Sequence, residues 1–305
     1  MAFGICLSTN AAYSEPLPKR SKSDRDINAI GHRQLAGAGP SAGNWYSTQK
    51  ETELGEKYSA ALEKSIPILH DPAIDAYIDA VAQKIAQNSD ATLPITVRVV
   101  NSAEVKALTL PGGRLYVTSG LLLKVQSEGE LASVLARGVA HTALHTFGRA
   151  LTRAALLQTM SPPATTSGSP FMGMPCGVSL NNSDLGSPLT FLNFCRGFEL
   201  DADYFGIQYL YKAGYDPECF VNVVQRLWTP TPGNTSEVFS VFPPLPDRLR
   251  QLRKEIQQIL PGRDVELVSN SGFSEFQEQV RSLTPPQPKP PLLPTLIRLD
   301  SSTTD

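Results

Sequence analysis

Apolar side chains recur at helical spacing in the first structured part of the chain. Between Ser47 and Glu63 they return every three or four positions, which predicts a helix. Asp71-Pro72 opens a second helix, because Asp caps a helix N-terminus and Pro suits its first turn. The apolar face of this second helix consists of Ile74, Ile78, Val81 and Ile85.

The pattern then changes to the alternation that is typical of strands. Residues 95–100 alternate between apolar and outward polar positions, and residues 105–110 lead into the turn Pro111-Gly112-Gly113. Residues 115–118 form the returning strand. These strands predict one small sheet, which is too small to be the core of a doubly wound fold.

Further helices follow the sheet. Ser127 and Glu130 form a capping box that begins a helix extending to about Phe147. Another helix is predicted over residues 190–213, because Gly214 and then Pro217 supply its stop. Residues 243–260 are amphipathic and predict one more helix. The predicted fold is therefore α+β, mainly helical with one small sheet.

Composition divides the chain into an arm, one domain and a tail. Residues 1–43 are polar after a short apolar start, which is either the remnant of a signal peptide or a disordered terminus. Residues 44–283 form the domain, with a loop insert at 160–190 that contains no regular period. Residues 284–305 are Pro-rich and are expected to be extended and disordered.

Charge and cysteine content narrow the functional classes. The 305 residues carry a net charge of -2, which argues against nucleic-acid binding. No stretch reaches the ~20 apolar residues of a membrane-spanning helix. The cysteines lack the spacing of a zinc ribbon, and the disulfide state of Cys176, Cys195 and Cys219 stays open. Neither an oligomeric state nor a particular partner is indicated.

Five segments carry the candidate chemistry. They occur in the order Leu110-Pro111-Gly112-Gly113, Glu130 to His141, Phe198 to Asp203, Ala213 to Pro217, and Pro243 to Arg248. Together they resemble the HtpX-like, BepA-like and CAAX-protease-like zinc metallopeptidases (gluzincins), and the resemblance covers residues 44–283. That family has a strand ending in Leu-Pro-Gly-Gly, an HExxH helix, and a second helix with ExxAD before Ala-Gly-Tyr-Asp-Pro.

The resemblance implies a zincin-like fold, zinc as the family's cofactor, and an exported protein in the periplasm or at a membrane. It also implies a substrate-aligning edge strand that includes Leu110, Gly112, Gly113 and Leu115. Such a strand binds an extended peptide by strand addition, and the same pattern fits a strand with a purely structural role equally well.

Departures from the family's pattern decide the expected function. Arg137 stands at the first His of HExxH, Gly138 at the general-base Glu, and Phe242 at a His before the paired prolines. His141 and Glu199 remain as ligands, with Asp203 behind them. A catalytic zinc site takes three protein ligands, and a guanidinium cannot be one of them. The sequence therefore predicts an inactive pseudopeptidase without zinc that binds extended or unfolded polypeptide, such as segments of envelope proteins.

Arg137 lies four residues before His141 and hence on the same helix face. We expect its guanidinium to fill the metal space and to pair with Glu199 or Asp203. Asp201 is expected to be solvated.

Two alternatives stay open. His141 and His145 are again four apart, with Thr142 where Glu should be, so a shifted site or one completed by a partner or by the loop insert would give an active zinc endopeptidase. The other interpretation places His145 at the surface or between helices. A relic without a present role also remains open.

Overall fold

The computed structural model describes residues 20–33, 35, 43–160, 189–227, 245–261 and 271–284. The part of the predicted insert at 161–188, the tail from 285 and Phe242 lie outside the described residues. The helices are α1 (Lys22–Arg25), α2 (Thr48–Glu63), α3 (Pro72–Ala86), α4 (Ser119–Lys124), α5 (Glu128–Ala143), α6 (Thr146–Met160), α7 (Leu189–Lys212), α8 (Glu218–Leu227), α9 (Leu245–Ile259) and α10 (Ser271–Leu283). The strands are β1 (Ile68–Leu69), β2 (Thr96–Val100), β3 (Ala107–Leu110) and β4 (Arg114–Thr118).

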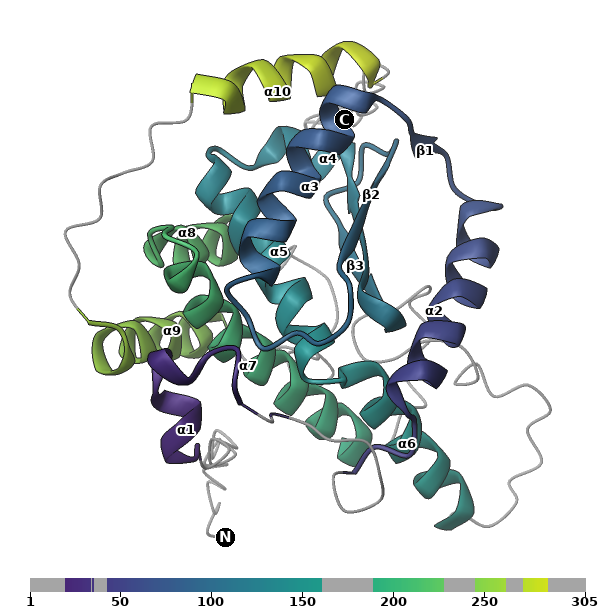
Figure 1. Cartoon of the computed structure of the whole chain (residues 1–305), viewed down its shortest axis with the longest axis vertical. Helices are drawn as coiled ribbons and strands as arrows, with labels where there is room; N and C mark the ends of the chain where they lie inside the picture. Colours follow the sequence, from purple (N-terminus) through teal and green to yellow (C-terminus); the bar gives the residue numbers. More distant parts are fainter. Residues whose placement is uncertain are drawn as a thin grey trace, which may run out of the picture.

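The predicted α+β class is confirmed: helices surround a single four-stranded sheet in the part of the chain described (Figure 1). The predicted helix start at Asp71 is also confirmed, because the Asp71 carboxylate accepts hydrogen bonds from the backbone N–H groups of Ala73 and Ile74. The apolar face predicted for α3 is buried in the core.

The sheet has the order β1-β2-β4-β3. β2 and β4 are parallel, whereas β1 pairs antiparallel with β2 and β3 pairs antiparallel with β4. β3 is therefore an edge strand within the described residues. The tight connection from β3 to β4 needs glycine, because Gly112 and Gly113 have φ angles of 74° and 76°. A Cβ on Gly112 would also lie 3.1 Å from the Cα of Thr52, so α2 packs directly on this turn.

α5 is the central helix of the domain and packs against the sheet, α3, α7 and α8 (Figure 1). It ends earlier than the sequence pattern predicts. The predicted helix to Phe147 is wrong, because α5 stops at Ala143 and His145 adopts the left-handed conformation, with φ 47°. The chain then begins α6 at Thr146 in a new direction. Because His145 is not a glycine, its residue type does not mark the end of α5 in the sequence.

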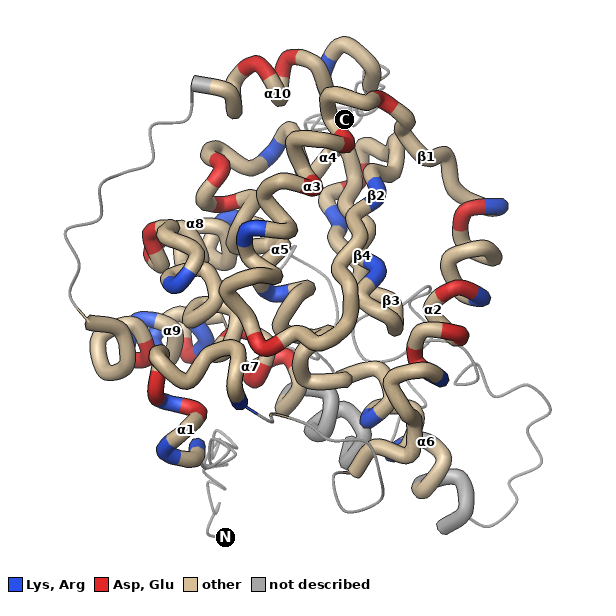
Figure 2. The backbone as a smooth tube through the Cα atoms, in the orientation of Figure 1, with Lys and Arg blue, Asp and Glu red and all other residues tan. Residues whose placement is uncertain are grey.

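Charged residues of both signs are interspersed along α2 and α9, while the sheet is mostly uncharged (Figure 2). No helix among the described residues is long and apolar enough to span a membrane. Cys219 is a free thiol, and burial raises its pKa to about 11. The side chains of Cys176 and Cys195 lie outside the described residues.

Candidate functional site

A cleft of about 660 Å³ lies between α5 and the β3 edge of the sheet. Residues of α2 and of the turn after β3 also line it, as does Glu199 of α7. The residues predicted for the substrate strand all line this cleft, namely Leu110, Gly112, Gly113 and Leu115. Arg137, Gly138, His141 and His145 line it as well. The structure thus brings the predicted strand and the predicted site on α5 together.

Arg137 points into the interior rather than toward solvent. Its side chain is 15% exposed and forms ion pairs with both Glu199 and Asp203, the second with 3.1 Å between Nε and Oδ1. The pairing expected for this guanidinium is therefore present. Burial lowers the pKa of Arg137 to about 10, although the Asp203 carboxylate opposes the shift. The side chain remains a cation at neutral pH.

Asp203 is shared with a second arginine. Arg248 of α9, which is 1% exposed, donates from Nε to Oδ2 at 2.7 Å and from Nη2 to Oδ1 at 2.9 Å. Two cations and two carboxylates, Arg137, Arg248, Glu199 and Asp203, thus form one buried cluster that joins α5, α7 and α9. No role for Arg248 was apparent from the sequence, although this residue closes the Pro243 to Arg248 segment.

His141 lies beside this cluster. Its Nε2 is 3.6 Å from Oε2 of Glu199, and its Nδ1 is 3.3 Å from the hydroxyl oxygen of Thr146. Burial lowers the pKa of His141 well below its ordinary value, and the positive charges of Arg137 and Arg248 lower it further. The imidazole is therefore neutral near pH 7.

His145 contacts a different carboxylate. Its Nδ1 lies 2.9 Å from Oε2 of Glu51, a buried residue of α2 whose other oxygen accepts a hydrogen bond from the Asn44 amide. The helix break at Ala143 separates His145 from the α5 face that carries His141. The side chain is 11% exposed and lies between helices. Sequence reasoning missed Glu51, since a glutamate within an amphipathic helix gives no signal of burial.

Gly138 lies where α5 comes close to the sheet. A Cβ at this position would be 2.5 Å from Cδ2 of Leu115 and 3.1 Å from Oγ1 of Thr109. Any side chain placed there requires the Leu115 side chain to shift.

These donors do not fit a catalytic zinc ion. Such a site takes three protein ligands. Among the described residues, no three His, Cys, Asp or Glu side chains are grouped so as to hold a metal. His141 and Glu199 are ligand types, but Arg137 brings a fixed positive charge onto Glu199.

Glu255 of α9 lies behind the cluster and gives a pH-dependent prediction. Its pKa is raised from the ordinary 4.5 to about 7, mainly by burial and also by the nearby Asp203 and Asp201, while a hydrogen bond from Gln251 and the charge of Arg20 oppose the shift. A carboxyl group with a raised folded-state pKa favours folding most below pH 4.5, and this contribution is lost as the pH rises through 7.

The Glu255→Gln variant should therefore be more stable than the unsubstituted protein at pH 8 by about 1–3 kcal/mol. The difference should disappear near pH 4, where both side chains are neutral. Urea unfolding across this range measures it. A stability gain that is equal at both pH values would contradict the shifted pKa.

Similarities to known proteins place these features in a known class of protein. The model of peptidase family M48 matches residues 72–256. The beta-barrel assembly-enhancing protease of Yersinia pestis is 29% identical over 241 residues, which are 74% of this chain and 48% of that protein. The protein of the same name from Escherichia coli is 27% identical over 240 residues, 74% of this chain and 48% of its own length.

The mitochondrial metalloendopeptidase OMA1 of Arabidopsis thaliana is 30% identical over 140 residues, 43% of this chain and 25% of that protein. The fold is thus that of a metallopeptidase-like domain. The chain belongs to peptidase family M48. It spans about half the length of the beta-barrel assembly-enhancing proteases that it matches.

Proposed function

We propose that this chain is a catalytically inactive member of family M48 that binds extended or unfolded polypeptide in the cleft between α5 and β3. The contact between Arg137 and Glu199 carries the proposal, because it places a cation against one of the two remaining ligand-type side chains. Gly138 adds to it, since glycine offers no general base on the α5 face that lines the cleft. Zinc is the cofactor of the family, and we propose that this chain functions without it.

The open edge of β3 is the feature that favours an extended polypeptide as the ligand. The backbone N–H of Thr118 donates to the carbonyl of Lys106 at 3.1 Å. Because hydrogen-bonded pairs alternate with non-bonded pairs in an antiparallel ladder, Ala107 and Thr109 direct their backbone groups away from β4. Both residues line the cleft, together with apolar side chains such as Leu108. An extended segment therefore has an edge to pair with and apolar surface to cover.

We propose that the protein is exported and acts in the periplasm or at a membrane, as its resemblance to the family implies. Two of the matched relatives are named for enhancing β-barrel assembly. Extended segments of chains that form β-barrels are therefore the proposed ligands.

Thr109→Pro should weaken binding of a fluorescein-labelled peptide of alternating Val and Thr residues roughly 3–10-fold, because it removes one edge N–H. Fluorescence anisotropy in EDTA measures the affinity. Thr109→Val is the matched control, since it keeps the N–H and the shape of the side chain, and it should bind as the unsubstituted protein does. If Thr109→Pro does not fold, Ala107→Pro repeats the test at an exposed edge position.

Equal affinity of the Pro and Val variants would exclude strand addition at this edge. Zinc-dependent cleavage of the peptide by the unsubstituted protein would instead establish the active alternative. His145, which is paired with Glu51, would then be the residue to replace next.

A further inference from the structure

The segment Arg20 to Arg33 runs along one face of α7, outside the residues that the family model matches. Arg20 pairs with Asp201 at 2.6 Å, and its guanidinium lies 4.1 Å from the centre of the Tyr204 ring. The hydroxyl of Tyr204 donates to the carbonyl of Asp24 at 3.3 Å. The expectation that Asp201 is solvated is therefore wrong. We call residues 20–33 the strap.

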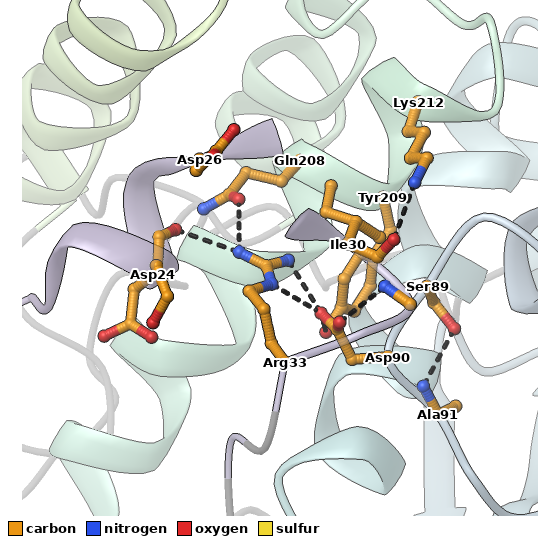
Figure 3. Close-up of polar contacts among 12 residues, drawn as sticks. Asp24, Asp26, Ile30, Arg33, Ser89, Asp90, Ala91, Gln208, Tyr209 and Lys212 are labelled. Carbon is orange, nitrogen blue, oxygen red and sulfur yellow. Dashed lines mark hydrogen bonds and ion pairs between the residues drawn. The ribbon is translucent and has the colours of Figure 1, made fainter. Parts of the chain in front are cut away.

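The strap is anchored by a buried ion pair. Arg33 binds Asp90 from the loop after α3, with 2.7 Å between Nη2 and Oδ2, and the two side chains are 1% and 0% exposed. Figure 3 shows that Arg33 also reaches α7, where its Nη1 donates to the Gln208 side chain at 2.9 Å. Lys212 at the end of α7 donates to the carbonyl of Ile30 at 2.7 Å (Figure 3).

The strap and the charged cluster contact opposite faces of the same helix. Asp201, Tyr204, Gln208 and Lys212 follow one another at intervals of three or four residues, which places them on one face of α7. Glu199 and Asp203 share the other face, where they meet Arg137 of α5. α7 is therefore held between the strap on one side and α5 on the other.

We propose that the strap sets the position of α7 and thereby keeps Glu199 and Asp203 in contact with Arg137. A force or a ligand that lifts the strap from α7 would then loosen the charged cluster across the helix. This inference concerns how the cleft is held in shape, and it stands whether or not the cleft binds polypeptide.

Arg33→Gln in the full chain tests the coupling, because it removes the charge that anchors the strap without touching the cluster. Hydrogen exchange followed by mass spectrometry should show amides 197–205 of α7 and 137–141 of α5 exchanging on the order of tenfold faster. Arg20→Gln, at the more exposed end of the strap, should give a smaller change in the same direction. If Arg33→Gln does not fold, Arg20→Gln still tests the coupling.

Gln277→Ala is the control, because its side chain donates at 2.8 Å to the carbonyls of Leu122 and Val125 and holds α10 on α4, away from α7. It should leave amides 197–205 unchanged. The proposal is overturned if the strap variants speed exchange only within the strap and residues 208–212, or if Gln277→Ala changes the α7 amides equally.

Discussion

Replacing Asp203 by Asn should lower the stability of the protein by about 3–5 kcal/mol, because two buried arginines would then lack their common carboxylate. Arg137 and Arg248 both bind Asp203, and neither can release its proton to escape burial. A loss of this size is a large part of the total stability of an ordinary domain, about 5–15 kcal/mol. Urea unfolding monitored by circular dichroism measures the loss.

Asp201→Asn is the matched control for this prediction, since it makes the same chemical change two residues away on α7. Asp201 is 15% exposed and holds one arginine, whereas Asp203 is 3% exposed and holds two, so the cost should be smaller, about 1–2 kcal/mol. Equal losses in the two variants would show that the buried cluster does not hold α5, α7 and α9 together.

Replacing Arg137 by His should create a zinc site from the new side chain, His141 and Glu199. We expect close to one zinc per chain by elemental analysis after dialysis, compared with near zero for the unsubstituted protein. At a zinc concentration 100-fold above the dissociation constant, binding should stabilise the variant by about 2.7 kcal/mol. Arg248 still pairs with Asp203 in this variant, which limits the cost of losing Arg137.

Adding Gly138→Glu tests whether the rest of the site has kept its geometry. The new side chain must displace Leu115, so the double variant should be less stable than Arg137→His by about 1–3 kcal/mol while it still binds zinc.

Combining Arg137→His with His141→Ala should remove the metal. If Arg137→His binds no zinc, His141 and Glu199 no longer stand at ligand spacing. Near one zinc in the unsubstituted protein would overturn the proposed inactivity.

Elements that begin or end with a distinctive residue pattern were predicted correctly from the sequence. Asp71-Pro72 marked the start of α3, and the two glycines after β3 marked the sharp turn. α8 was missed, although Phe220, Val221 and Val224 repeat at helical spacing after Asp216-Pro217. α10 was missed too, although the end of the domain was placed at residue 283, where this helix ends.

The contacts that hold the site join residues from different elements, so only some of them could be predicted from the sequence. The spacing of Arg137 and His141 predicted the ion pairs with Glu199 and Asp203, since both positions share one helix face. Nothing local indicated that Arg33 meets Asp90, because the two are far apart in the sequence and each alone resembles a surface charge. The end of α5 was misplaced for a similar reason, since the contact of His145 with Glu51 comes from another helix.

The buried cluster of Arg137, Arg248, Glu199 and Asp203 also affects how the domain depends on its surroundings. A metal that joins helices must be supplied by the environment, and it is lost when its histidine ligands become protonated. The cluster consists of side chains that the chain carries itself, and Arg137 stays charged with a pKa of about 10. The contacts that join α5, α7 and α9 therefore need no metal from the environment, whereas a zinc-held junction would come apart under metal starvation.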